Sequence, residues 1–229
     1  MLLPQLRQQV LEANLELSRR GLAIYTFGNA SGISRDGGLV VIKPSGVPYE
    51  TMRPEHLVIT DLSGRVVEGS LRPSSDLATH LVLYRAFSGI GGVVHTHSAH
   101  ATAWAQAGRE IPCLGTTHAD YFYGPVPVTA PLAASRIASE YEANTGHAIV
   151  ERIGEADPMQ VPAVLVASHG PFCWGATPAE AAHNAVILEE VARMAWLTAA
   201  LGDAKPVPQA LLDRHFLRKH GAAATYGQR

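Results

Sequence analysis

Two short apolar runs that each end in histidine place the tightest constraint on how this chain can fold. Residues 91–97, GGVVHTH, set two valines between a glycine pair and two histidines, and residues 161–168, VPAVLVAS, lead into His169. Apolar runs this short, bounded by glycine, proline and polar residues, are typical of buried strands rather than helices. We therefore predict two buried strands, the second a central one that ends in a turn at residues 169–175.

Helix signals surround these runs. Thr177-Pro178-Ala179-Glu180 combines a capping residue, proline at the first helical position and glutamate at the third, which predicts a helix to about Leu201. Residues 37–46 predict a further strand, and residues 56–69 predict a hairpin that turns at Leu62-Ser63-Gly64. Other predicted helices lie before Gly21, from a cap at Ser75 to about Phe87, after Ser98, in the alanine-rich stretch after residue 128, and over residues 208–221. This order predicts a mixed α/β fold in which helices cover a central, largely antiparallel sheet, formed as one domain of residues 1–229.

Charge and hydropathy exclude several classes of function. The formal net charge is -2, from 18 basic and 20 acidic residues without a basic stripe, so we expect no nucleic-acid partner. The first 21 residues are interrupted by Arg7, Glu12 and Glu16, unlike a signal peptide or a membrane span, so we expect a cytoplasmic protein with no membrane partner. Cys113 and Cys173 lack a CxxC spacing and are expected to be reduced and packed.

The histidines at the ends of the two apolar runs form a candidate metal site. Residues i and i+2 of a strand point to the same face, so His95 and His97 present two imidazoles roughly 7 Å apart at Cα. Imidazole suits zinc, manganese, cobalt or nickel, and a catalytic site needs a third ligand while leaving positions open for substrate. His169 is the best candidate for that ligand, and Asp76 could add a carboxylate or act as a base.

A single histidine is more often a hydrogen-bonded structural residue than a ligand, so the metal site is predicted from the two runs together and not from any one histidine. Six other histidines are expected on helix surfaces, in loops or in supporting positions, without a catalytic role: His56, His80, His100, His147, His183 and His220. Gly28 with Gly32, and Gly37 with Gly38, lack the spacing of a nucleotide-binding loop.

Six segments together resemble the class II aldolase/adducin family: GNASG, IKPSGV, PSSD, VVHTHSAHATAWA, TTHADYFYG and SHGPFCWG. The resemblance covers nearly the whole chain and is strongest to the family's ketopentose-phosphate epimerases, because the TTHADYFYG loop and the HFLRKHG…YGQ tail are both present. It implies a class II aldolase-like fold and a metal-dependent isomerase that interconverts L-ribulose 5-phosphate and D-xylulose 5-phosphate in pentose catabolism, with the arabinose, ascorbate and other routes left open.

The resemblance also implies one divalent ion per subunit, first of all Zn²⁺, with Mn²⁺, Co²⁺ and Ni²⁺ as alternatives. His95, His97 and His169 would hold it, with Asp76 near or on the metal. It further implies a homotetramer with four-fold symmetry and active sites at subunit interfaces. Two alternatives stay open: a lyase that cleaves fuculose or rhamnulose 1-phosphate, and a non-catalytic domain like the adducin head, which should lack the three histidines.

Inversion at C4 of a 2-ketopentose 5-phosphate is difficult by deprotonation, since the C4 hydrogen is not next to the carbonyl. Cleavage and re-formation of the C3–C4 bond avoids this problem and needs two proton-transfer groups. By resemblance these are Asp120 and Tyr226, the latter reaching in from a neighbouring subunit, with His215 or Arg218 as supporting positive groups. Thr225 is a departure, because a second tyrosine is expected at that position in many epimerases.

The phosphate of the substrate is expected among small and polar residues that supply amide, hydroxyl and ammonium donors. These residues are Asn29, Lys43, Ser45, Gly46, Ser74 and Ser75.

Overall fold

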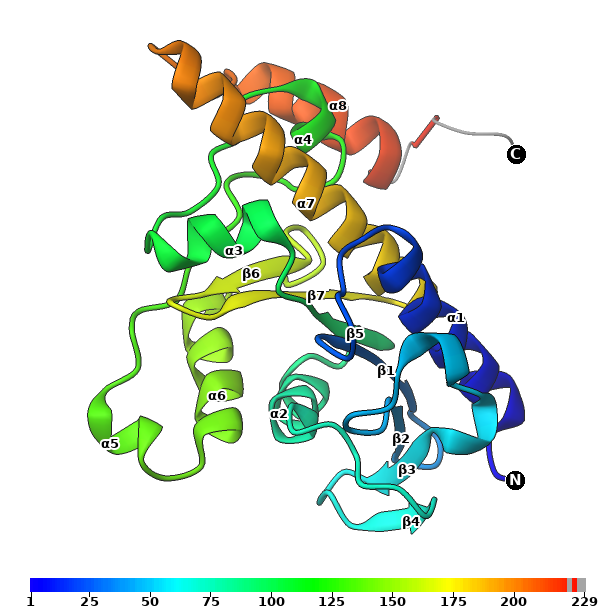
Figure 1. Cartoon of the computed structure of the whole chain (residues 1–229). Helices are drawn as coiled ribbons and strands as arrows, with labels where there is room; N and C mark the ends of the chain where they lie inside the picture. The colour runs from blue at the N-terminus through cyan, green and yellow to red at the C-terminus, as the bar shows by residue number, and fades with distance from the viewer. Residues whose placement is uncertain (222–223, 226–229) are drawn as a thin grey trace.

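The computed structural model describes residues 1–221 together with residues 224 and 225, and its helices and strands are interleaved along the chain (Figure 1). The strands are β1 (Asn29–Ser34), β2 (Leu39–Ile42), β3 (Val58–Asp61), β4 (Val66–Glu68), β5 (Gly92–His95), β6 (Ala163–Val166) and β7 (Gly170–Gly175). The helices are α1 (Pro4–Arg19), α2 (Leu77–Ala86), α3 (Ala99–Gln106), α4 (Thr116–Ala119), α5 (Ala134–Ile137), α6 (Tyr141–Ile153), α7 (Pro178–Leu201) and α8 (Gln209–His220), with two short 3-10 turns, η1 (Tyr49–Thr51) and η2 (Pro54–His56).

The strands form one sheet in the order β4-β3-β2-β1-β5-β7-β6, and every neighbouring pair of these strands is antiparallel. The predicted antiparallel sheet and the hairpin between β3 and β4 are thus confirmed. In the centre of the sheet, His95 of β5 lies opposite Asn29 of β1 on one side and Phe172 of β7 on the other. Strands β1 and β5 therefore bring the polar residues Asn29 and His95 to the same end of the sheet.

Helices cover both faces of the sheet, which makes three layers (Figure 1). Helices α1, α3 and α7 pack on one face, where Leu17, Leu188 and Val191 contribute to the buried core. Helices α2 and α6 pack against each other on the opposite face, over a second core that includes Tyr84 and Trp174. Burial of both faces explains why the central strands are apolar on both sides.

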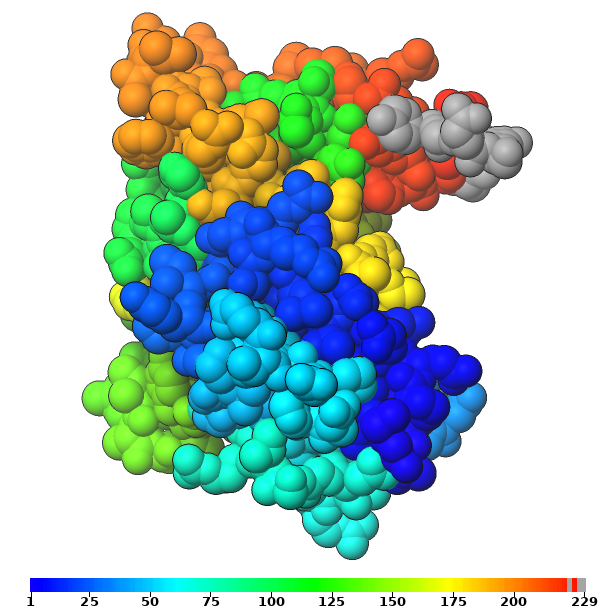
Figure 2. All heavy atoms as spheres, turned by 45° about the vertical axis from the view of Figure 1, so that its right-hand side comes forward, coloured from blue at the N-terminus to red at the C-terminus, as the bar shows by residue number. Residues whose placement is uncertain are grey.

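Helices α4 and α8 pack together at one end of the molecule, away from the edge strand β4 (Figure 1). Figure 2 shows the same end as a protruding group formed by the last part of α7, α4 and α8. A small apolar cluster of Cys113, Ala119 and Leu212 holds α4 to α8.

Three details of the sequence prediction are wrong. Residues 170–175, predicted as a turn, form β7, whose residues are all buried between β5 and β6. The apolar run that forms β6 is consequently the last strand of the sheet rather than a central one. Ser75, predicted as a cap, does not cap α2: the helix begins at Leu77 after Asp76, and the carboxylate of Asp76 hydrogen-bonds Asn29 rather than a backbone N–H of the helix.

Two further observations concern membrane-spanning helices and the two cysteines. Within the described part of the chain, no helix has both the length and the apolar character needed to cross a membrane. Cys113 and Cys173 are free and buried, as predicted.

Candidate active site

The histidines predicted to bind a metal lie together at the end of the central strands. His95 is the last residue of β5, His97 follows two residues later, and His169 lies in the turn between β6 and β7. The ring centroids of the three pairs are 4.7 to 5.1 Å apart. One potential ligand atom from each ring lies within 4.8 Å of the other two.

Close backbone packing around these rings requires glycine at two positions. At Gly28, which has a φ of +74°, an added Cβ would lie 2.8 Å from the carbonyl oxygen of His95. At Gly170, an added Cβ would lie 2.7 Å from the carbonyl oxygen of Thr96. Any side chain there would push apart the segments that carry the histidines.

The protonation of the rings suits a bound cation. His95 Nδ1 lies 3.0 Å from the carbonyl oxygen of Pro171, to which it donates, so the lone pair of Nε2 faces the Nε2 of His97 at 3.0 Å. Burial lowers the pKa of His95 to about 3 and also lowers the pKa of His169, which keeps both rings neutral. Two ring nitrogens facing each other at this distance match a divalent ion with bonds of about 2.0–2.1 Å to each nitrogen. The residues present therefore fit a divalent metal ion.

Asp76 lies beside this group but not within it, because the set of mutually close ligand atoms consists of the three histidines among the described residues. The Nδ2 of Asn29 donates to Asp76 Oδ2 at 2.6 Å and to Ser74 Oγ at 3.0 Å. Burial acts to raise the pKa of Asp76, but His95, His80 and the Asn29 amide outweigh burial and hold it below its usual range. Asp76 is thus an oriented, ionised carboxylate at the edge of the histidine cluster.

A cavity of about 410 Å³ joins the histidines to the predicted phosphate-binding residues. All six of those residues line it: Asn29, Lys43, Ser45, Gly46, Ser74 and Ser75. Asp76, His95, His97 and His169 line the same cavity. Residue order alone does not indicate this convergence, which depends on the pairing of β1 with β5 and on the position of α2.

Lys43 is the cation of this cavity. Its side chain is buried, and its Nζ lies 3.3 Å from the carbonyl oxygen of Pro44 and 3.5 Å from that of Thr26. No carboxylate of the described residues pairs with it, and burial lowers its pKa from 10.5 to about 8. A buried ammonium group without an anionic partner favours an anionic ligand such as a phosphate.

Asp120, His215 and Arg218 come together elsewhere, between α4 and α8, and none of them lines the cavity. Asp120 accepts hydrogen bonds from His215 Nδ1 at 3.0 Å and from Arg218, while Lys219 Nζ lies 3.4 Å from its carboxylate. Burial acts to raise the pKa of Asp120, but His215 and the two cations hold it below its usual range. Tyr226 lies outside the described residues.

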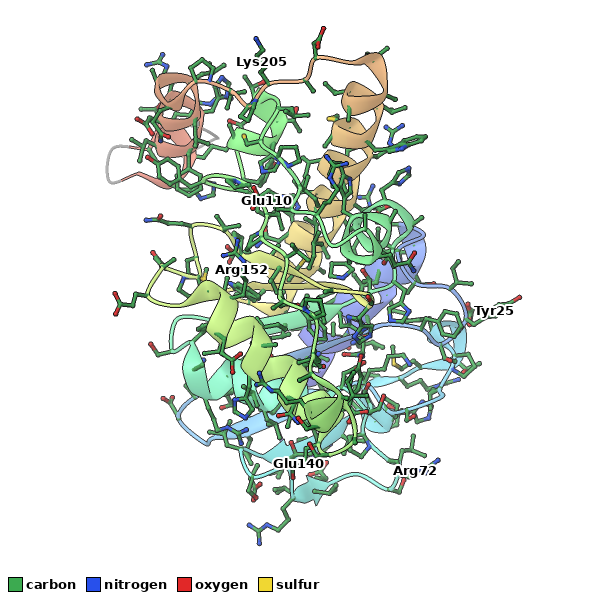
Figure 3. The ribbon with its side chains drawn as sticks, turned by 90° about the vertical axis from the view of Figure 1, so that its left-hand side faces the viewer. Tyr25, Arg72, Glu110, Glu140, Arg152 and Lys205 are labelled. Carbon is green, nitrogen blue, oxygen red and sulfur yellow. The ribbon has the colours of Figure 1, made fainter. Side chains whose placement is uncertain are left out.

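The sequence analysis missed several residues of the cavity wall. Tyr141 and Glu142, at the start of α6, line the cavity, and the hydroxyl of Tyr141 lies 3.4 Å from Nδ1 of His169. Thr26 and Phe27 line it from the loop before β1. In the same loop, Tyr25 points away from the molecule and is 80% exposed (Figure 3). No local motif marks these residues, because they reach the cavity only through the packing of α6 and of the loop.

The chain is similar to known proteins over most of its length. The family model of the class II aldolase and adducin N-terminal domain matches residues 8–196, which include every residue that lines the cavity. An L-ribulose-5-phosphate 4-epimerase UlaF of Salmonella paratyphi B is 55% identical over 226 residues, 98% of this chain and 99% of the relative, and the protein of that name from Salmonella typhi matches equally well.

Solved structures give the same fold. An L-fuculose 1-phosphate aldolase superposes with a TM-score of 0.78 at 25% identity and covers 92% of this chain and 94% of its own. The L-fuculose-1-phosphate aldolase of Thermus thermophilus has a TM-score of 0.68 at 25% identity, covering 88% of this chain and 98% of its own.

Proposed function

The chain belongs to the class II aldolase and adducin family, and we propose that it is an isomerase that interconverts L-ribulose 5-phosphate and D-xylulose 5-phosphate. The reaction breaks the C3–C4 bond of the ketose phosphate and re-forms it on the opposite face of the aldehyde carbon. The observation that carries this proposal is the single cavity that joins three clustered histidines to the buried ammonium group of Lys43. Such a cavity is suited to a substrate that has both a chelating hydroxyketone and a phosphate.

Each end of the substrate has its own binding groups in this proposal. Lys43 pairs with the phosphate, and the hydroxyls and amides of Asn29, Ser45, Gly46, Ser74 and Ser75 complete its hydrogen bonds. His95, His97 and His169, with Asp76 beside them, would hold a divalent ion, which would supply Lewis-acid stabilisation of the negative charge left on the C2 and C3 oxygens after cleavage. Zn²⁺ is the first candidate, because three imidazoles with an open position are typical of catalytic zinc sites.

The two proton transfers at the C4 oxygen are assigned to Asp120 and Tyr226 of a neighbouring subunit, supported by His215 and Arg218. Within one chain the Asp120 cluster lies outside the cavity, so these residues can act there only if subunits assemble with α4 and α8 beside the cavity of the next copy. Asp120, held ionised by its cations, suits the role of proton acceptor in one half of the reaction.

A homotetramer is part of the proposal. The second half of α7 carries exposed apolar side chains, including Trp196 at 55% exposure and Leu201 at 88%. Exposed apolar surface of this kind is typical of subunit interfaces. We further infer that the 229 residues act as one domain and that the enzyme works in the cytoplasm, where free cysteines such as Cys113 and Cys173 stay reduced.

A lyase is the second candidate, since the chain shares its fold with L-fuculose 1-phosphate aldolases. One assay separates the two functions: the enzyme is incubated with L-ribulose 5-phosphate and added Zn²⁺, Mn²⁺, Co²⁺ or Ni²⁺, and products are separated by chromatography. We expect D-xylulose 5-phosphate to form. Release of glycolaldehyde phosphate without the epimer would instead establish the lyase, and the same assay with fuculose and rhamnulose 1-phosphates would identify its substrate.

A further inference from the structure

A row of buried polar side chains leads from Asp76 into the core between α2 and β1. Asp76, His80 and Tyr84 are four residues apart, so they lie on one face of the helical segment. The Oγ of Ser31 in β1 lies 2.7 Å from His80 Nδ1 and 2.8 Å from the hydroxyl of Tyr84. Ser31, His80 and Tyr84 are all 0% exposed. The row is therefore sealed from solvent except at the Asp76 end, which reaches the cavity.

Hydrogen bonds join the three buried groups of this row. In the bond between Ser31 and Tyr84 either hydroxyl can donate, and the direction of the bond between Ser31 and His80 depends on which ring nitrogen carries the proton. A proton on Nε2 of His80 makes Ser31 the donor to Nδ1 and Tyr84 the donor to Ser31. Burial lowers the pKa of His80 to about 4, so the ring is neutral and carries a single proton.

The Nε2 of His80 is buried and has no hydrogen-bond partner within the described part of the chain. An unpaired buried N–H costs about 1–3 kcal/mol, so a buried donor of this kind normally has an acceptor. Asp76, one helical turn earlier, is the adjacent acceptor, and its charge acts to raise the pKa of His80. One oxygen of Asp76 accepts from Asn29, which leaves its other oxygen available.

We propose that His80 is a positioning residue, whose neutral Nε2–H donates to the Asp76 carboxylate through a buried water and fixes that carboxylate against the three histidines. The inference rests on the metal site of the proposed function, but it concerns a residue outside that site. Hydrogen bonds to groups around a metal typically change its affinity by about 10- to 100-fold. His80 would thus act on the metal through Asp76 without touching metal or substrate.

Two substitutions at position 80 test the roles of the two ring nitrogens separately. In His80→Asn the amide can replace Nδ1 toward Ser31 but cannot reach the position of Nε2, whereas in His80→Gln the amide reaches the position of Nε2. Affinity for Zn²⁺ is measured by competition with a chromogenic chelator, and stability by thermal unfolding of the metal-free proteins. We expect His80→Asn to weaken Zn²⁺ binding by about 10- to 100-fold and His80→Gln to stay within a few-fold of the unsubstituted protein.

His118→Asn is the matched control, because His118 is another buried histidine, and its Nε2 bonds the carbonyl of Gly124 away from the cavity. It should lower thermal stability and leave Zn²⁺ affinity unchanged. Nitrogen-15 NMR of the metal-free protein gives a second readout, in which the His80 proton is expected on Nε2.

Equal Zn²⁺ affinity in both position-80 variants, whether retained or lost, would overturn the proposal, as would a proton found on Nδ1. These outcomes are distinct from a failure of the proposed function, because Zn²⁺ affinity and tautomer are measured without substrate. The epimerase assay on the unsubstituted enzyme tests that function separately.

Discussion

Replacement of Lys43 by methionine should stabilise the substrate-free protein and at the same time weaken substrate binding. The long contacts of Lys43 Nζ to the carbonyl oxygens of Pro44 and Thr26, at 3.3 and 3.5 Å, contribute little. The free-energy cost of burying the ammonium group is larger. Burial lowers the pKa of Lys43 from 10.5 to about 8, which corresponds to roughly 3 kcal/mol. Solvent in the open cavity screens part of this penalty, so we expect Lys43→Met to gain about 1–2 kcal/mol at pH 7.

The sign of the pH dependence follows from linkage. Below pH 8 the lysine is protonated in both the folded and the unfolded state, so the penalty is present in full. Between pH 8 and 10.5 the unfolded state binds more protons, and the stability of the unsubstituted protein should rise with pH. Lys43→Met should lack this rise. Thermal unfolding at pH 7 and at pH 9.5 measures both effects, and a gain of about 1–2 kcal/mol corresponds to a Tm increase of roughly 2–8 °C in a chain of this size.

The kinetic effect has the opposite direction. A charge-assisted contact to phosphate is worth about 1.5–3 kcal/mol, so KM for L-ribulose 5-phosphate should increase roughly 10- to 100-fold. Lys43→Arg keeps the charge and serves as the control for phosphate binding. The reasoning is refuted if Lys43→Met is less stable than the unsubstituted protein at pH 7 and has the same KM.

Three further predictions concern the metal site and the proton-transfer groups. His97→Ala should lose bound metal and activity together, and stoichiometric metal found by elemental analysis in the purified variant would argue against its role as a ligand. Gly28→Ala should destabilise the fold by about 1–3 kcal/mol and weaken metal binding, because Gly28 has a positive φ and an added Cβ would lie 2.8 Å from the His95 carbonyl oxygen. Gly108→Ala is the control for φ alone, because Gly108 also has a positive φ but has open space around the added Cβ. Tyr226→Phe should keep metal and fold but lower kcat/KM for epimerisation by about 10²- to 10⁴-fold in both directions, and an unchanged rate would remove this phenol from the mechanism.

The sequence predicts best the features that depend on local periodicity and chemistry. The cap of α7 is one example: Thr177 accepts from the backbone N–H of Glu180, as the motif predicts. The three histidines are another, because His95 ends β5, His97 follows two residues later, and His169 follows the apolar run that forms β6. In such cases a few adjacent residues determine the geometry.

Features that depend on long-range packing were not predictable in this way. Residues 170–175 contain glycine and proline, which suggest a turn, but pairing with β5 and β6 makes them a buried strand. Tyr141 and Glu142 have no motif and reach the cavity only because α6 packs on α2. Helix α3 follows Ser98 as predicted, yet Glu189 of α7, and not the Ser98 side chain, accepts from the backbone N–H groups of His100 and Ala101. Each of these contacts joins parts of the chain that are far apart in sequence.

Helix α7 has a consequence for how copies of the chain can join. Its 24 residues extend about 36 Å, from contacts with β5 and β7 to a surface beside α4. It therefore acts as a spacer of fixed length between the metal cavity and the Asp120 cluster. A head-to-tail ring closes only when each subunit turns by the same angle relative to the next, and a rigid spacer helps to set that angle. In the homotetramer proposed above, the length of this one helix would then help to set the number of subunits, and insertion or deletion of a turn should change the number of subunits before it changes the chemistry.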